Sequence, residues 1–183
     1  MKNIVILSLL IFLSACATSV NVDYLPGTNF AALKSFRVEE KPVAVTKDPR
    51  VNSPFIQKRI IEALKSQLNL KGLIAKKDKP DVIVKYHLAI KQELESDDSG
   101  VAFGIGSSSS NSAFGIMFGS GGGVASVDNL LITIDLVKSG NKKLLWRGSF
   151  DRRLAAGTTP ESSTQLINSM VKEILDKFPP KQP

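Results

Sequence analysis

Cysteine and histidine are nearly absent from this sequence, which has one of each among its 183 residues. One histidine cannot build a histidine-cluster metal site, and one cysteine cannot form a disulfide within the chain. The sequence also lacks Gly-x-Gly-x-x-Gly and Gly-Lys-Ser/Thr, the glycine patterns that bind phosphate groups. We therefore expect no metal, no cofactor and no enzymatic activity.

Long apolar runs are also scarce. The run from Ile4 to Leu13 has ten residues, whereas a helix that spans a bilayer needs about 20. Lys2 precedes this run and small residues follow it, which is the layout of a secretory signal. The segment Leu13-Ser14-Ala15-Cys16 then matches a lipobox, so we predict a signal peptide over residues 1–15 that is cleaved between Ala15 and Cys16.

Lipidation of Cys16 would follow from this motif. The thiol receives a diacylglyceryl group, typically carrying palmitate, and a further acyl chain on the amine makes the anchoring stable. Residues 16–19 form only a short tether before the first predicted strand. Ala17 stands where an inner-membrane retention signal places Asp. We therefore expect a protein of the cell envelope, anchored in the outer membrane and facing the periplasm.

The formal net charge is +7, and removal of the signal peptide takes away only Lys2. A basic surface of this kind attracts anionic lipids, acidic polymers or nucleic acid, and the predicted compartment excludes nucleic acid. Arg147, Arg152 and Arg153 are candidates for a basic patch near the last predicted hairpin. A merely soluble basic surface is the alternative.

Periodicity predicts one α+β domain over residues 20–178, followed by a short tail at 179–183. Alternating apolar residues indicate strands near 20–24, 35–39, 82–95, 130–138 and 144–150. Apolar stripes at helical spacing, preceded by Ser53-Pro54 and Thr159-Pro160, indicate two amphipathic helices. We expect a mostly antiparallel sheet of about five strands with both helices packed on one face.

A Gly/Ser-rich insert over residues 96–125 separates two of these strands. It holds eight of the thirteen glycines, and Ala102-Phe103-Gly104-Ile105 returns as Ala113-Phe114-Gly115-Ile116. The repeat predicts a long hairpin excursion, either a partner-free extension or an interface with protein or lipid. The candidate interface residues are its large apolar side chains: Phe103, Ile105, Phe114, Ile116, Met117 and Phe118.

Two other features suggest chemistry only weakly. His87 lies on the wetter face of a predicted strand, which is typical of a sheet-surface histidine rather than a catalytic one. Asp97 and Asp98 begin the insert, where acidic residues are common in turns, and a divalent-ion site is the alternative there.

The order of these features resembles the lipoproteins that carry domain of unknown function 4136. The resemblance depends on a strand directly after the lipid cysteine, on Pro80-Asp81-Val82-Ile83-Val84-Lys85-Tyr86, on Leu145-Trp146-Arg147-Gly148, and on a final helix that ends at Lys177-Phe178-Pro179-Pro180. It implies an envelope lipoprotein of α+β build and carries over no activity, cofactor or catalytic residue. The insert departs from the family pattern, because relatives often have Trp and Tyr there.

Two functions remain open from the sequence. The first is a non-enzymatic interaction or accessory module at the membrane surface, attached through the lipid on Cys16 and contacting an envelope protein. The second is a domain that binds a small ligand or an anionic envelope polymer through the basic hairpin and the open face of the sheet.

Overall fold

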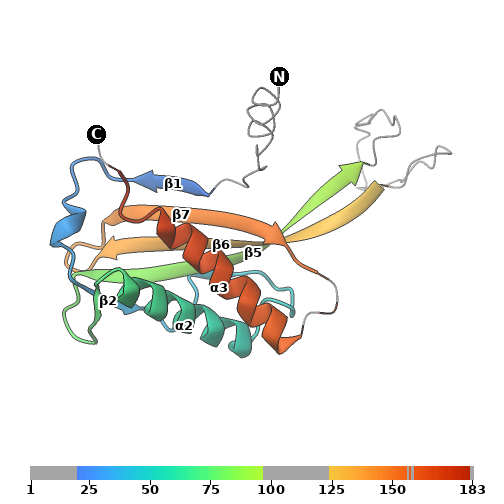
Figure 1. The fold of residues 1–183 in the computed structure, drawn as a ribbon, viewed down its shortest axis with the longest axis horizontal. Helices are drawn as coiled ribbons and strands as arrows, with labels where there is room; N and C mark the ends of the chain where they lie inside the picture. Colours follow the sequence, from blue (N-terminus) through green and yellow to red (C-terminus); the bar gives the residue numbers. More distant parts are fainter. Residues whose placement is uncertain (1–19, 97–123, 156, 158, 182–183) are drawn as a thin grey trace, which may run out of the picture.

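The computed structural model describes residues 20–96, 124–155, 157 and 159–181. These residues form one sheet with two long helices packed on one of its faces (Figure 1). The strands are β1 Asn21–Tyr24, β2 Ser35–Val38, β3 Ala44–Val45, β4 Ile74–Ala75, β5 Val82–Ser96, β6 Val124–Lys138 and β7 Leu144–Arg153. The helices are the short 3-10 turn η1 Phe30–Ala32, α2 Pro54–Leu70 and α3 Pro160–Asp176.

The sheet has seven strands in the order β1-β7-β6-β5-β2-β4, and β3 pairs with β5 beside β2. The expectation of a mostly antiparallel sheet of about five strands is wrong, because the sheet is mixed and has seven strands. β2 pairs in parallel with both β5 and β4, and β3 pairs in parallel with β5. The reason is the crossover through α2, since a strand that returns after a helix runs parallel to the strand before it.

β5 and β6 form the backbone of the sheet. They pair antiparallel along their whole length, from Val82 opposite Lys138 to Ser96 opposite Val124. The predicted hairpin insert joins these two paired ends, and its residues 97–123 lie outside the described part of the chain. β7 then continues the antiparallel order beside β6, and β1 pairs with β7 at the edge.

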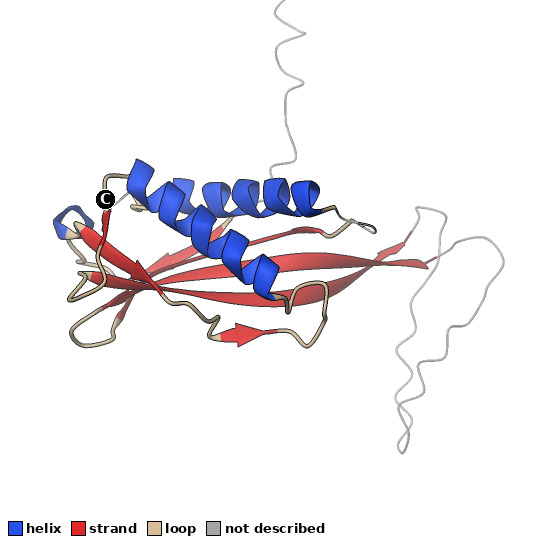
Figure 2. Cartoon of the chain, turned by 90° about the horizontal axis from the view of Figure 1, so that it is seen from below, coloured by secondary structure: helices blue, strands red, loops and turns tan. Residues whose placement is uncertain are grey.

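Both helices cover the same face of the sheet (Figure 2), as the two apolar stripes predict. Ser53 caps α2 by accepting a hydrogen bond from the Phe55 N–H, and Pro54 occupies its first turn. Thr159 and Ser162 form a capping box at the start of α3. Both helices therefore begin where the sequence predicts, directly after Ser53 and Thr159.

The core lies between the helices and the even-numbered side chains of β5. Val82, Val84 and Tyr86 are fully buried, and they face buried residues of β6 and β7 and the apolar stripes of both helices. Aromatic rings close this core next to β1, where Phe178 makes edge-on contacts with Phe30 and Trp146. The odd-numbered side chains of β5 point to the opposite, open face of the sheet.

Candidate functional site

Most residues that the sequence singles out lie outside the described part of the chain. This applies to Ala15 and Cys16, to the pair Asp97-Asp98, and to the whole candidate interface. The interface residues are Phe103, Ile105, Phe114, Ile116, Met117 and Phe118. The lipidation site and the insert therefore stay predictions.

The structure does not bring the three predicted arginines together. Arg147 and Arg153 lie opposite Asp135 and Asn129 on the open face of the sheet. Arg152 points to the helix face, where its guanidinium donates to Glu173 and to Ser169 of α3 at 2.6 Å and 3.0 Å. The alternation of strand side chains separates neighbouring residues in this way.

A compact charge network occupies the open face around Asp135. Arg147 donates to both carboxylate oxygens of Asp135, with Nε–Oδ1 at 2.6 Å and Nη2–Oδ2 at 2.7 Å. Nε2 of His87 lies 3.1 Å from Oδ2 of the same carboxylate. The hydrogen bonds from Arg147 to Asp135 raise the pKa of the guanidinium, with the Asp135 and Asp23 charges adding to this. The network therefore joins side chains of three strands, β5, β6 and β7.

The sequence pattern does not reveal the partner of His87. In the structure, the hairpin of β6 and β7 places Arg147 directly opposite Asp135, with a register shift between Leu136 and Val137 that the sequence does not indicate. The structure brings the single histidine to this pair through its contact with the Asp135 carboxylate. The described residues include no cluster of His, Cys, Asp or Glu suited to a metal ion.

A groove of about 620 Å³ runs along the opposite edge of the sheet, between α2 and β2. We call it the edge groove. Its floor is formed by Phe36, Val38 and Ile61, of which the first two are buried. Its rim carries charged side chains from β2 and the segment after it, from α2, and from the segment after β4: Arg37, Glu39, Glu40, Lys41, Lys65, Lys76 and Lys77.

The backbone of β2 is open along this groove. The Lys76 N–H donates to the Phe36 carbonyl at 2.8 Å, and the pairing of β4 with β2 ends there. The Glu39 N–H donates to the Val84 carbonyl on the other side of β2. Because successive residues of a strand direct their backbone groups to opposite edges, the N–H and C=O of Val38 face the groove. No described strand pairs with them there.

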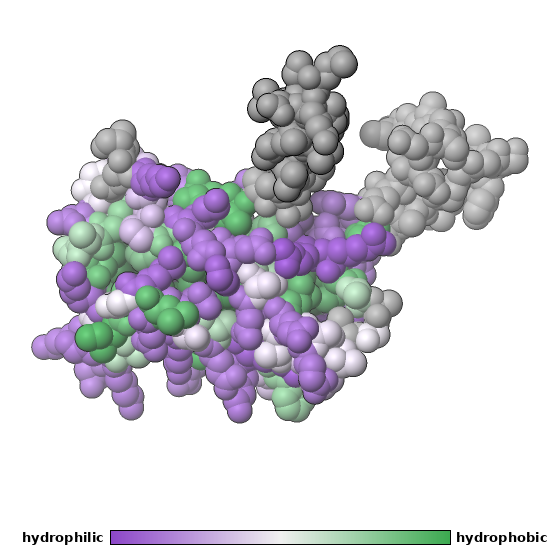
Figure 3. All heavy atoms as spheres, in the orientation of Figure 1, coloured by the Kyte–Doolittle hydropathy of each residue, from purple (hydrophilic) through white to green (hydrophobic). Residues whose placement is uncertain are grey.

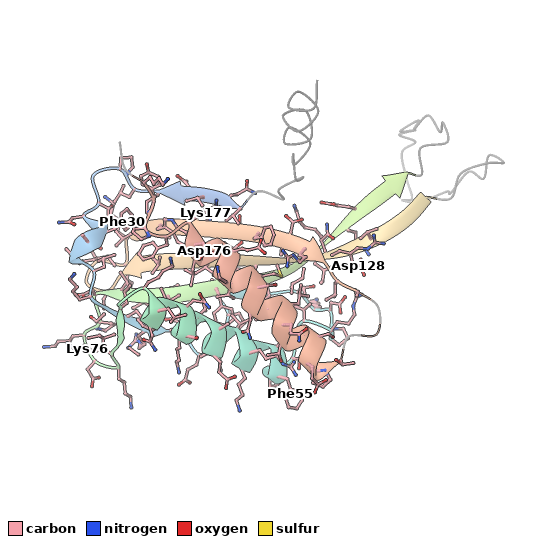
Figure 4. All side chains as sticks on the ribbon, viewed as in Figure 1. Phe30, Phe55, Lys76, Asp128, Asp176 and Lys177 are labelled. Carbon is pink, nitrogen blue, oxygen red and sulfur yellow. The ribbon has the colours of Figure 1, made fainter. Side chains whose placement is uncertain are left out.

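The rim of the edge groove is predominantly basic. Its five basic side chains outnumber its two acidic ones, and none of the seven forms an ion pair with another residue in the described ranges. Lys76 projects outward from the molecule (Figure 4), and hydrophilic side chains project along the side where α2 runs (Figure 3). Arg37 also donates to the Lys77 carbonyl, which holds this loop beside β2.

Asp81 fixes the position of β2 next to this groove. Its carboxylate accepts hydrogen bonds from the Lys34 and Ser35 N–H groups at 3.0 Å and 2.9 Å, and from the Ser35 hydroxyl at 2.8 Å. These bonds, the Lys34 N–H first, hold the pKa of Asp81 below its usual range. The start of β2 is therefore joined to the start of β5 by side-chain as well as backbone contacts.

The fold defines a small α+β domain, a mixed sheet with both helices on one face and the edge groove along one side. The chain belongs to the family described as "Domain of unknown function (DUF4136)", whose model matches residues 20–180. This confirms the resemblance that the sequence motifs indicate. The comparison with curated proteins found no match.

Solved structures share this fold at low sequence identity. A PDZ domain protein from Parabacteroides distasonis is 14% identical with a TM-score of 0.54, and the match covers 90% of this chain and 36% of that one. PelC from Paraburkholderia phytofirmans, solved as a dodecamer, is 11% identical with a TM-score of 0.50 over 90% of this chain and 98% of that one. A DUF4136 family protein from Bacteroides thetaiotaomicron is 14% identical with a TM-score of 0.48, covering 88% and 95%.

These likenesses concern the fold alone. This chain spans about a third of the Parabacteroides protein, since the match covers 36% of that chain. None of the described helices is long and apolar enough to cross a bilayer.

Proposed function

We propose that this chain is a non-enzymatic lipoprotein of the bacterial envelope, held at the membrane by the lipid on Cys16, where its domain binds a partner. The observation that carries the proposal is the distance along the chain from the lipobox to the fold. Cys16 precedes the first residue of β1, Asn21, by five positions. An extended tether of this length reaches about 15 Å, so the domain stays next to the headgroups.

The edge groove supports the binding role. An apolar floor with a charged rim and unpaired strand backbone is the usual composition of a peptide-binding or ligand-binding site. The Asp135 network, in contrast, satisfies its own charges. Ala17, which stands directly after the cysteine, favours the outer membrane and its periplasmic side.

Fractionation of cells tests the anchoring. Cys16→Ser should remove incorporation of labelled palmitate and move the protein from the membrane to the soluble fraction. The matched control is Ser14→Ala, which keeps the cysteine and a small residue before the cleavage site. Continued membrane attachment and labelling of the Cys16→Ser protein would contradict the proposal.

An anionic envelope polymer is a second candidate ligand. The excess of basic side chains around the edge groove favours it. The arginines of the last hairpin do not, because Arg147 and Arg152 already pair with Asp135 and Glu173. Neutralising Lys76 and Lys77 should therefore weaken binding of an anionic glycan more than neutralising Arg152 does.

A further inference from the structure

We propose that the edge groove binds an extended acidic peptide segment of another protein, which adds as a strand beside β2. This inference deepens the proposed function and rests on it for the view that the domain is an interaction module. Each of three features of the groove, its backbone, its floor and its charge, selects one property of the ligand.

The backbone selects an extended peptide. β4 pairs with β2 only at Ser35 and Phe36, and Lys76 and Lys77 then line the groove, where Arg37 donates to the Lys77 carbonyl. The N–H and C=O of Val38 therefore face the position where a longer β4 would continue. A peptide strand in that position would satisfy both groups, which is how sheet edges recruit peptides in strand addition.

The floor selects alternating side chains. Phe36 and Val38 point to the helix face, and Ile61 and Lys65 lie one turn apart on α2 above them. In a strand added here, every second side chain would point toward this apolar floor, and the others would point toward the opposite face beside Arg37. The best ligand therefore alternates apolar and acidic residues.

The charge selects an acidic partner and disfavours a second copy of this chain. Pairing of two such edges would bring two sets of basic side chains together, a like-charge arrangement that sheet edges use to prevent self-association. Pro42 limits the open stretch, because it has no N–H to offer a neighbouring strand.

The sheet order disfavours lipid headgroups as the ligand. The predicted tether leads into β1, and β4 is at the other end of the order β1-β7-β6-β5-β2-β4. Five interstrand spacings of about 4.8 Å separate the two edges by about 24 Å. A domain held to the membrane beside β1 therefore turns the edge groove toward the aqueous compartment, where a protein segment can reach it.

Binding of synthetic peptides to the full lipidated chain in non-ionic detergent tests the inference. The probe is a fluorescent peptide of alternating Glu and Val, and the control is the same peptide with Lys in place of Glu. We expect the Glu/Val peptide to bind and the Lys/Val peptide not to bind. Lys76→Glu together with Lys77→Glu should weaken binding by about tenfold or more. The matched control reverses Lys142 and Lys143, exposed neighbours that do not line the groove.

N-methylated peptides separate strand addition from simple charge attraction. Methyl groups on alternate amides block one edge of the bound strand, and methyl groups on the other set block the opposite edge. We expect one set to lose about tenfold in affinity and the other to lose little, because only one edge donates to β2. Equal affinities for both sets would overturn strand addition. Binding of an anionic glycan that displaces the peptide, with no sensitivity to methylation, would also overturn it and favour the polymer.

These results are independent of the anchoring test. A chain that binds the Glu/Val peptide but carries no lipid would refute the membrane attachment and keep the groove. A lipidated chain that binds neither peptide would refute the groove and keep the attachment.

Discussion

Gly148 is the residue whose side chain the fold can least accommodate. A Cβ at this position would lie 2.4 Å from Cη2 of Trp146 and 2.7 Å from Cγ2 of Ile174. Gly148→Ala should therefore lower the free energy of unfolding by about 2 kcal/mol, since α3 must move away from β7. Urea unfolding of the two proteins measures this difference.

Gly140 provides the control for that substitution, because no heavy atom lies within 4 Å of a Cβ built there. Gly140→Ala should change the free energy of unfolding by less than about 0.5 kcal/mol. Equal losses for the two alanine variants would contradict the packing argument.

Asp135 is the buried acid of the open face, with its side chain 7% exposed. Asp135→Asn removes the charge that faces Arg147 and His87. Because the side chain of Arg147 is 46% exposed and can be solvated, the expected loss is about 1–2 kcal/mol, below that of a fully buried pair. Chemical denaturation at neutral pH measures it. Asp151→Asn, which breaks a more exposed pair with Lys91, should cost less than about 1 kcal/mol.

At the scale of elements, Asp81 joins β2 to β5 and so sets the edge of the groove. Its folded-state pKa lies below the ordinary value of 3.8 because the carboxylate accepts hydrogen bonds from Lys34 and Ser35. A depressed pKa gives stability that is present above the unfolded-state pKa and is lost as the pH falls through the folded-state value. Asp81→Asn should therefore be less stable than the wild type at neutral pH, and the difference should shrink in acid.

Unfolding midpoints in urea across this pH range measure the Asp81 effect. The exposed neighbour Asp78, for which no hydrogen bond is found in the described part of the chain, is the control. The unfolding midpoint of Asp78→Asn should differ little from that of the wild type across this pH range. A constant difference for Asp81→Asn from neutral pH into acid would show that its charge is not what stabilises β2.

The helices and the long strands could be predicted because each carries its signal locally. α2 and α3 have caps and apolar stripes, and β5 alternates over most of its length. β3 and β4 have two residues each, too few for any periodicity to appear. Their pairing depends on β5 and β2, which are distant in sequence, so the mixed character of the sheet could not be read from the pattern.

The edge groove could not be predicted for a similar reason. Its lining comes from three segments, residues 36–41, residues 61–65 and residues 75–77, and each one alone is an ordinary stretch of a basic protein. The Asp135–Arg147 pair could not be read from the turn alone, because the register of β6 and β7 shifts between Leu136 and Val137. The edge groove depends instead on the crossover through α2.

At the scale of the whole molecule, the two edges of the sheet should face different surroundings. The exposed apolar residues Val22 of β1 and Ile74 of β4 report on these edges. If the lipid on Cys16 holds β1 near the headgroups, a photo-crosslinking amino acid at Val22 should give lipid adducts in intact membranes, and the same amino acid at Ile74 should give few. Mass spectrometry of the adducts measures the ratio. Inserting a long Gly/Ser linker after Ser19 should abolish the adducts at Val22, because the domain can then leave the surface. Equal lipid labelling at both edges would mean that the edge groove also lies against the membrane, and the argument against a lipid ligand there would fail.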